Sequence, residues 1–108
     1  MEFKQEYQND VKIISINGRI DSQTDSFSED MDNAIEGENK ILVDCSGMDY
    51  INSAGLRVFL SALKKATKNN GKFYVCNLND NITEIFNISG FSQLFSIYDS
   101  KEEALNNF

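Results

Sequence analysis

The spacing of hydrophobic and polar positions predicts the first structural elements of the chain. Phe3, Gln5 and Tyr7 alternate with charged residues, and apolar residues return over 11–16 after the turn-like run Gln8-Asn9-Asp10. Alternation interrupted by a short polar turn is typical of two paired strands. The pattern predicts an opening β-hairpin that ends before Asn17-Gly18.

The hydrophobic period lengthens after this hairpin. From residue 24 to Gly37 the spacing is helical, with apolar positions at Phe27, Met31, Ala34 and Ile35. The continuous apolar run Ile41–Val43 predicts a buried strand. A second helix is expected from near Ser53 to a stop at residues 69–71, with an apolar stripe at Leu56, Phe59, Leu60, Leu63 and Ala66.

Shorter elements are predicted in the last third of the chain. Phe73–Cys76 is expected to form a strand parallel to the preceding one, because a helix separates them. Ile82, Ile85 and Phe86 fit a short helix that ends near Gly90, and Leu94–Tyr98 is typical of a late strand. Ser100-Lys101-Glu102-Glu103 has the form of a helix capping box. We therefore expect one α/β domain over residues 1–108, with a mixed sheet of four to five strands and about four helices.

Composition limits the classes of partner. The chain has 108 residues, 41% hydrophobic and 25% charged, which suits a single folded domain. A net charge of −7 opposes binding to nucleic acid and to anionic membranes, because both need clustered cations. Neither a signal peptide nor a run long enough to span a bilayer is visible. We expect a cytoplasmic protein with no nucleic-acid partner and no membrane insertion.

The absence of histidine removes most catalytic chemistry. Ser-His and Cys-His pairs, HExxH zinc sites and histidine proton relays are all excluded. The chain also lacks GxGxxG and GxxxxGK[ST] loops, and its two cysteines do not form a CxxC unit. No catalytic residue and no metal site is predicted. Cys45 and Cys76 are expected to be buried thiols, and a thiol-based redox protein is the remote alternative.

The segment before the second helix is the candidate functional region. Ser46–Asn52 is longer than a typical strand-to-helix connection, and we expect it to form a loop. The N-terminus of the helix that follows offers unpaired N–H groups to an anion. Asn52 and Ser53 are also common helix caps, so local sequence leaves a purely structural role open. Gly55 weakens a helix, which suggests a close approach to a neighbouring strand.

Five segments in order resemble a bacterial STAS domain of the anti-sigma factor antagonist type. They are Asn17-Gly18-Arg19-Ile20-Asp21, Ile41-Leu42-Val43-Asp44, Tyr50-Ile51-Asn52-Ser53-Ala54-Gly55-Leu56, Ile88-Ser89-Gly90-Phe91 and Ser100-Lys101-Glu102-Glu103-Ala104-Leu105. The resemblance implies that Ser53 accepts phosphate from a partner anti-sigma factor that is also an ATP-dependent serine kinase. Asn52 stands where the family usually has Asp, and Ala54 where it has a second hydroxyl residue. Ser53 is thus the only hydroxyl in the motif.

The resemblance also implies a switch and its partners. Unmodified protein would bind the anti-sigma factor and release a sigma factor, and phosphoserine would block that binding until a serine phosphatase removed it. The chain itself would hold no cofactor, because ATP and magnesium belong to the kinase, and it would be a monomer when free. The expected partner-binding residues are Asp21, Asp49, Asn52, Ser53, Ala54, Gly55 and Arg57.

A second function within the same family stays open. A STAS domain can also serve as a subunit of a transport or sensory complex, where the same segment is a docking surface without phosphorylation.

Overall fold

The computed structural model describes residues 1–21, 24 and 26–108. Within this part of the chain lie five strands, four α-helices and one short 3-10 helix. In chain order they are β1 (Glu2–Gln8), β2 (Val11–Ile20), α1 (Phe27–Ile35), β3 (Lys40–Ile51), α2 (Ser53–Lys68), β4 (Lys72–Cys76), α3 (Asp80–Ile88), η1 (Phe91–Gln93), β5 (Ser96–Tyr98) and α4 (Lys101–Leu105). The predicted mixed α/β fold is confirmed.

The five strands form one sheet in the order in which they occur along the chain. β1 and β2 are antiparallel, as expected of the opening hairpin, and β2, β3, β4 and β5 run parallel to one another. Asn9 makes the hairpin turn with a φ of 57°, a left-handed conformation that asparagine tolerates. The parallel pairs are joined by helical connections, as parallel strands require.

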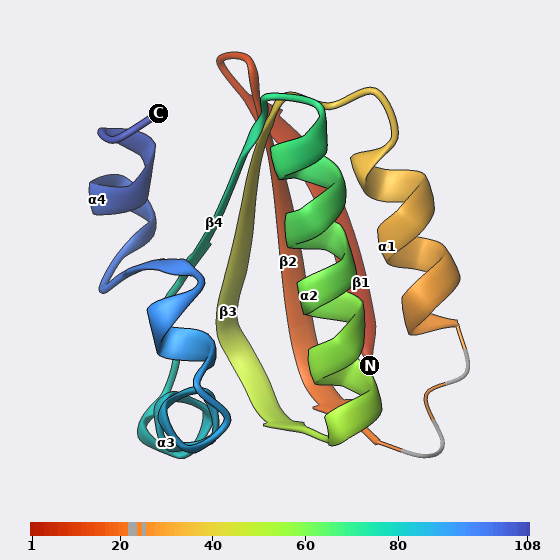
Figure 1. Ribbon diagram of the computed structural model, residues 1–108, viewed down its shortest axis with the longest axis vertical. Helices are drawn as coiled ribbons and strands as arrows, with labels where there is room; N and C mark the ends of the chain where they lie inside the picture. Colours follow the sequence, from red (N-terminus) through yellow and green to blue (C-terminus); the bar gives the residue numbers. More distant parts are fainter. Residues whose placement is uncertain (22–23, 25) are drawn as a thin grey trace.

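The helices cover both faces of this sheet. Figure 1 shows α1 and α2 side by side, with α4 set apart from them beyond β4. Alternate residues of β2 separate the two cores: Ile14 packs in the cluster with α1 and α2, whereas Ile13 packs with Ala104 of α4. This explains why Ile41–Val43 is apolar at every position, as the sequence predicted for a strand buried on both sides.

Phe59 of α2 is the centre of the larger core. It is fully buried, and four other rings have centroids 5.9–6.4 Å from its own. Those rings belong to Phe27, Phe73, Phe86 and Phe95, so they come from α1, β4, α3 and the segment before β5. Packing around one side chain therefore fixes α2 relative to the rest of the fold.

The prediction of a loop at Ser46–Asn52 is wrong. β3 continues to Ile51, and β2 continues beyond Asn17-Gly18 to pair with it. Register shifts in this pairing place the buried residues three apart, at Cys45, Met48 and Ile51, so the two-residue period of a strand is hidden. β4 pairs with β3 only as far as Asp44. The end of β3 is thus a two-stranded extension of the sheet.

The late strand is also shorter than predicted. Its strand portion is Ser96–Tyr98, and the preceding residues form η1, which begins after Gly90 at a φ of 81°. Leu94 is 56% exposed instead of lying in a strand. The capping box is placed as expected, since the Ser100 hydroxyl accepts a hydrogen bond from the Glu103 N–H at 3.0 Å. In the described part of the chain, no helix is long and apolar enough to cross a membrane.

Candidate functional site

Ser53 is the first residue of α2 and its side chain is exposed. The residue before it, Asn52, is the helix N-cap: its Oδ1 accepts the Gly55 N–H at 2.9 Å. The backbone N–H of Asn52 donates to the carbonyl of Ile20 at 3.0 Å. Asn52 is therefore fixed through both its backbone and its side chain. The capping role that the sequence left open belongs to Asn52, and the Ser53 hydroxyl is available at the surface.

Gly55 allows the first turn of α2 to lie against the sheet extension. A Cβ atom there would come within 2.7 Å of Ile51 Cγ1 and 2.8 Å of Ile20 Cγ2. Both isoleucines are buried, so neither can move freely. The predicted close approach at Gly55 is confirmed, and it sets the distance between Ser53 and the end of β2.

Asp21 follows directly after β2 and is held by a local turn. Its N–H donates to Thr24 Oγ1 at 3.1 Å, and its carbonyl accepts the Thr24 N–H at 3.0 Å. Arg19 lies 3.4 Å from the Asp21 carboxylate and 4.6 Å from the centroid of the Tyr50 ring. A cation between a carboxylate and an aromatic face ties the ends of β2 and β3 together.

A small hollow of about 110 Å³ brings several predicted residues together. Asp21, Asn52, Ala54 and Gly55 all line it. Its remaining lining comes from Ile20, Thr24, Phe27, Ser28 and Val58. The predicted surface is therefore assembled from the end of β2, the start of α1 and the first turn of α2.

The other predicted residues do not line this hollow. Ser53 and Asp49 are exposed nearby in the chain, in the first turn of α2 and the end of β3. Arg57 is exposed one helical turn after Ser53 and lines a different hollow on the outer face of α2. Residues four apart on a helix are neighbours, so a group on Ser53 is within reach of the Arg57 guanidinium.

Two supporting residues were not predicted. Thr24 shapes the turn at Asp21 through three hydrogen bonds. Asn79 caps α3 by accepting the Ile82 N–H at 2.9 Å, and its amide donates to the carbonyl of Met48 at 3.0 Å. Asn79 therefore supports β3 where β4 no longer pairs with it. The cap could have been predicted from the sequence, because an asparagine directly before a helix commonly caps it. The hydrogen bond to Met48 could not, because it depends on tertiary structure.

Asp44 does not belong to this site. Its carboxylate accepts the Ser46 N–H and the Asn77 amide, each at 3.0 Å, where β4 ends. The extended chain from there to Ile51 covers roughly 20 Å, well beyond the Debye length of about 8 Å. Although Asp44 is only nine residues from Ser53 in the chain, its charge therefore adds little at Ser53.

The two cysteines have the properties of inert thiols. Both are free and fully buried, Cys45 in the larger core and Cys76 in the smaller one. Burial raises the pKa of Cys45 well above its ordinary value and, with the nearby Asp44 charge, raises the pKa of Cys76 to about 12. A reactive cysteine needs a lowered pKa and access to solvent. These features oppose the redox alternative.

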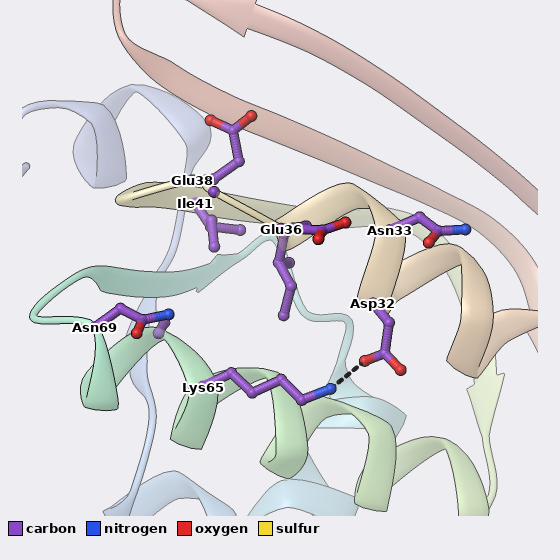
Figure 2. Close-up of a pocket in the computed structure, with 10 residues that line it drawn as sticks. Asp32, Asn33, Glu36, Glu38, Ile41, Lys65 and Asn69 are labelled. Atoms are coloured by element: carbon purple, nitrogen blue, oxygen red, sulfur yellow. Dashed lines mark hydrogen bonds and ion pairs between the residues drawn. The ribbon is translucent and has the colours of Figure 1, made fainter.

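A separate cleft of about 380 Å³ lies where α1 and α2 end. Figure 2 shows Asp32 and Lys65 pointing toward one another there, joined by an ion pair of 2.6 Å. Glu36 and Glu38 also line this cleft, and none of the predicted site residues does. Since α2 starts at Ser53 and ends beside this cleft, the two lie at opposite ends of the helix. Among the described residues, no group of three or more cysteine, aspartate or glutamate side chains could hold a metal ion.

Comparison with known protein families identifies the family of this chain. The STAS domain family model matches residues 3–104, which is nearly the whole chain. The chain belongs to the STAS domain family. The resemblance found in the sequence is thereby confirmed.

Two relatives of this STAS domain have names that refer to sigma-factor control. BtrV of Bordetella bronchiseptica, provisionally named an anti-sigma factor antagonist, is 39% identical over 69 residues, 64% of this chain and 60% of BtrV. The chain thus spans less than two thirds of BtrV. The anti-sigma F factor antagonist of Paenibacillus polymyxa is 27% identical over 97% of this chain and 92% of its own.

Solved structures agree on the fold of this STAS domain. A crystal structure from Thermotoga maritima superposes with a TM-score of 0.90 at 23% identity, covering 97% of this chain and 92% of the other. The Bacillus cell fate determinant SpoIIAA in its phosphorylated form superposes with a TM-score of 0.73 at 18% identity, covering 98% of each chain. At these identities the likeness concerns the fold alone.

Proposed function

We propose that this STAS domain is a cytoplasmic anti-sigma factor antagonist whose binding is switched by phosphorylation of Ser53. The observation that carries the proposal is an exposed serine at the first position of α2, beside a hollow lined by Asp21, Asn52 and Ala54. The names of the relatives support the same class of partner.

The phosphoryl transfer depends on groups that the partner brings. The Ser53 Oγ forms a bond to the γ-phosphorus of ATP while the bond from that phosphorus to the bridging oxygen breaks, and ADP leaves. A base must take the hydroxyl proton, and this chain has no histidine to do so. The base, the nucleotide and its magnesium are therefore assigned to the anti-sigma factor acting as a serine kinase. A serine phosphatase would reverse the step by hydrolysis.

The added phosphate changes charge more than shape. It brings about −1.5 to −2 charges and three acceptor oxygens to one exposed point. The helix N-terminus and Arg57 stabilise it locally, which for the helix end is worth about 0.3–1 kcal/mol. A partner that approaches the Asp21 hollow with a surface complementary to the unmodified protein would meet this charge directly. Binding is then lost without rearrangement of the fold.

The test uses an anti-sigma factor kinase encoded in the same genome. Incubation with ATP should add one phosphate, located on Ser53 by mass spectrometry, and Ser53→Ala should accept none. Ser53→Ala should also bind the kinase like the unmodified protein, whereas Ser53→Asp should bind at least about tenfold more weakly, a difference of about 1.4 kcal/mol. Ser61→Ala, an exposed serine two turns further along α2, is the matched control.

The outcome separates the two STAS functions. Equal affinity of Ser53→Ala and Ser53→Asp, with no phosphate incorporated, would contradict the switch. It would favour the alternative in which this surface is a docking module of a transport or sensory complex.

A further inference from the structure

The outer face of α2 forms a groove whose lining, apart from Arg57, lies outside the residues predicted at the Ser53 site. Two adjoining hollows, of about 390 and 540 Å³, share Leu60, Lys64 and Lys68. The larger one is completed by Leu63, Thr67 and Leu94. These six residues are here called the α2 groove.

Leu94 forms the side of the α2 groove that lies opposite the helix. It belongs to a tight turn in which the N–H groups of Leu94 and Phe95 both donate to the Phe91 carbonyl, at 2.9 and 3.0 Å. Phe91 and Phe95 pack against the core with ring centroids 5.4 Å apart. The turn is thus anchored from below while its leucine is 56% exposed. With the half-buried Leu60 and Leu63, Leu94 forms a contiguous apolar surface, the kind of feature that marks an interaction site.

The charge of the α2 groove is opposite to that of the protein. The chain has a net charge of −7, yet α2 carries four of its ten basic residues and no carboxylate. Lys65 pairs with Asp32 at 2.6 Å. For Lys64 and Lys68, no carboxylate of a described residue lies within the 4.0 Å of an ion pair. Two ammonium groups that pair with no described carboxylate therefore border an apolar groove.

We propose that the α2 groove binds an acidic amphipathic helix of a partner protein. Lys64 and Lys68 are one turn apart, about 6 Å along the axis, which matches carboxylates spaced by four residues on a second helix. Apolar side chains on the same face of that helix would cover Leu60, Leu63 and Leu94. A helix is favoured over a strand because the groove is lined by one face of α2 and by Leu94 of the turn after η1, and none of its six residues belongs to a strand.

This binding does not depend on phosphorylation of Ser53. The α2 groove begins about two turns after Ser53, and none of its six residues lines the Asp21 hollow. A single STAS domain could therefore hold one partner at the start of α2 and a second along its outer face.

A designed peptide can test the proposal with the full chain. The probe is a fluorescent helix of about 18 residues with Leu and Glu repeated on one face, and its binding is followed by anisotropy. We expect saturable binding that weakens with salt. Lys64→Glu/Lys68→Glu should weaken it at least about tenfold, the effect of losing two interfacial charge pairs. Leu94→Ser should weaken it several-fold.

Matched controls distinguish the groove from net charge alone. Lys4→Glu/Lys72→Glu changes the net charge by the same amount on the exposed surface of β1 and β4, and should alter affinity less than about twofold. A scrambled peptide of identical composition should bind weakly. Thermal melts should show that every variant is folded.

Four results would overturn the proposal. They are the absence of saturable peptide binding, equal weakening by the two double variants, tighter association with vesicles of anionic lipid than with the peptide at physiological salt, and a dimer in sedimentation that Leu94→Ser dissociates. The third result would assign the groove to a membrane surface, and the fourth to a second copy of this chain.

Discussion

The two halves of α2 use the same helix in different ways. At its start, Asn52 and Gly55 tie the helix to the ends of β2 and β3 through a cap, a backbone hydrogen bond and close packing. Further along, Lys64 and Lys68 project from the outer face into solvent. The shape of the surface at the start of α2 depends on contacts with the rest of the fold. The two lysines further along form a charged surface that pairs with no described carboxylate. Substitutions at Asn52 and Gly55 should therefore change stability, and substitutions at Lys64 and Lys68 should change binding alone.

Gly55→Val should give the largest effect on stability. The new side chain overlaps the buried Ile20 and Ile51, whose nearest atoms lie 2.8 and 2.7 Å from the position of its Cβ. Overpacking of this kind typically costs about 1–3 kcal/mol, and the β-branched side chain places the value near the upper end. Urea denaturation measures the loss.

Ala54→Val is the matched control, because it introduces the same side chain at an exposed neighbouring position. Its effect should stay within about 0.5 kcal/mol. Equal losses for the two variants would show that α2 does not depend on close approach at Gly55.

Asn52→Ala should destabilise the fold by about 1 kcal/mol, because the Gly55 N–H loses its acceptor. Asn52→Asp keeps an oxygen in the same place and adds a negative charge at the helix N-terminus, so it should be as stable as the original or slightly more stable. The comparison is made by urea denaturation at low salt. A similar loss for both variants would mean that the side-chain cap contributes nothing.

The sequence was sufficient for the parts of this site that local rules determine. Helical spacing predicted α2 and its start near Ser53, and the cost of glycine in a helix predicted the close approach that Gly55 makes. The family resemblance then directed attention to the hydroxyl of Ser53. Each of these inferences uses residues within about one or two helical turns of one another.

What the sequence could not predict depends on contacts between distant segments. The two-residue period of β3 is broken by register shifts against β2, so a strand was mistaken for a loop. Asn79 reaches Met48 from 31 residues away. Lys64 and Lys68 lie outside the apolar stripe predicted for the second helix, but the α2 groove exists only because Leu94, after η1, lies across from them.

Tyr50→Leu should have a smaller effect at the edge of the Ser53 site. The Arg19 guanidinium lies over the Tyr50 ring, and exposed pairs of this kind contribute about 0.5–1 kcal/mol. A double-mutant cycle with Arg19→Gln isolates this energy in urea denaturation. A coupling energy of zero would show that the two strand ends are held by backbone pairing alone.

Lys64→Gln/Lys68→Gln should have the smallest effect on stability, below about 0.5 kcal/mol. Neither ammonium group is near a carboxylate of a described residue, and glutamine has a helix propensity close to that of lysine. The small loss of stability is expected at Lys68, because this cation lies in the last turn of α2 and interacts favourably with the negative end of the helix dipole. Urea denaturation should show nearly unchanged stability while binding of the acidic peptide falls. A loss above about 1 kcal/mol would mean that these lysines support the fold, and the contrast between the two halves of α2 would no longer hold.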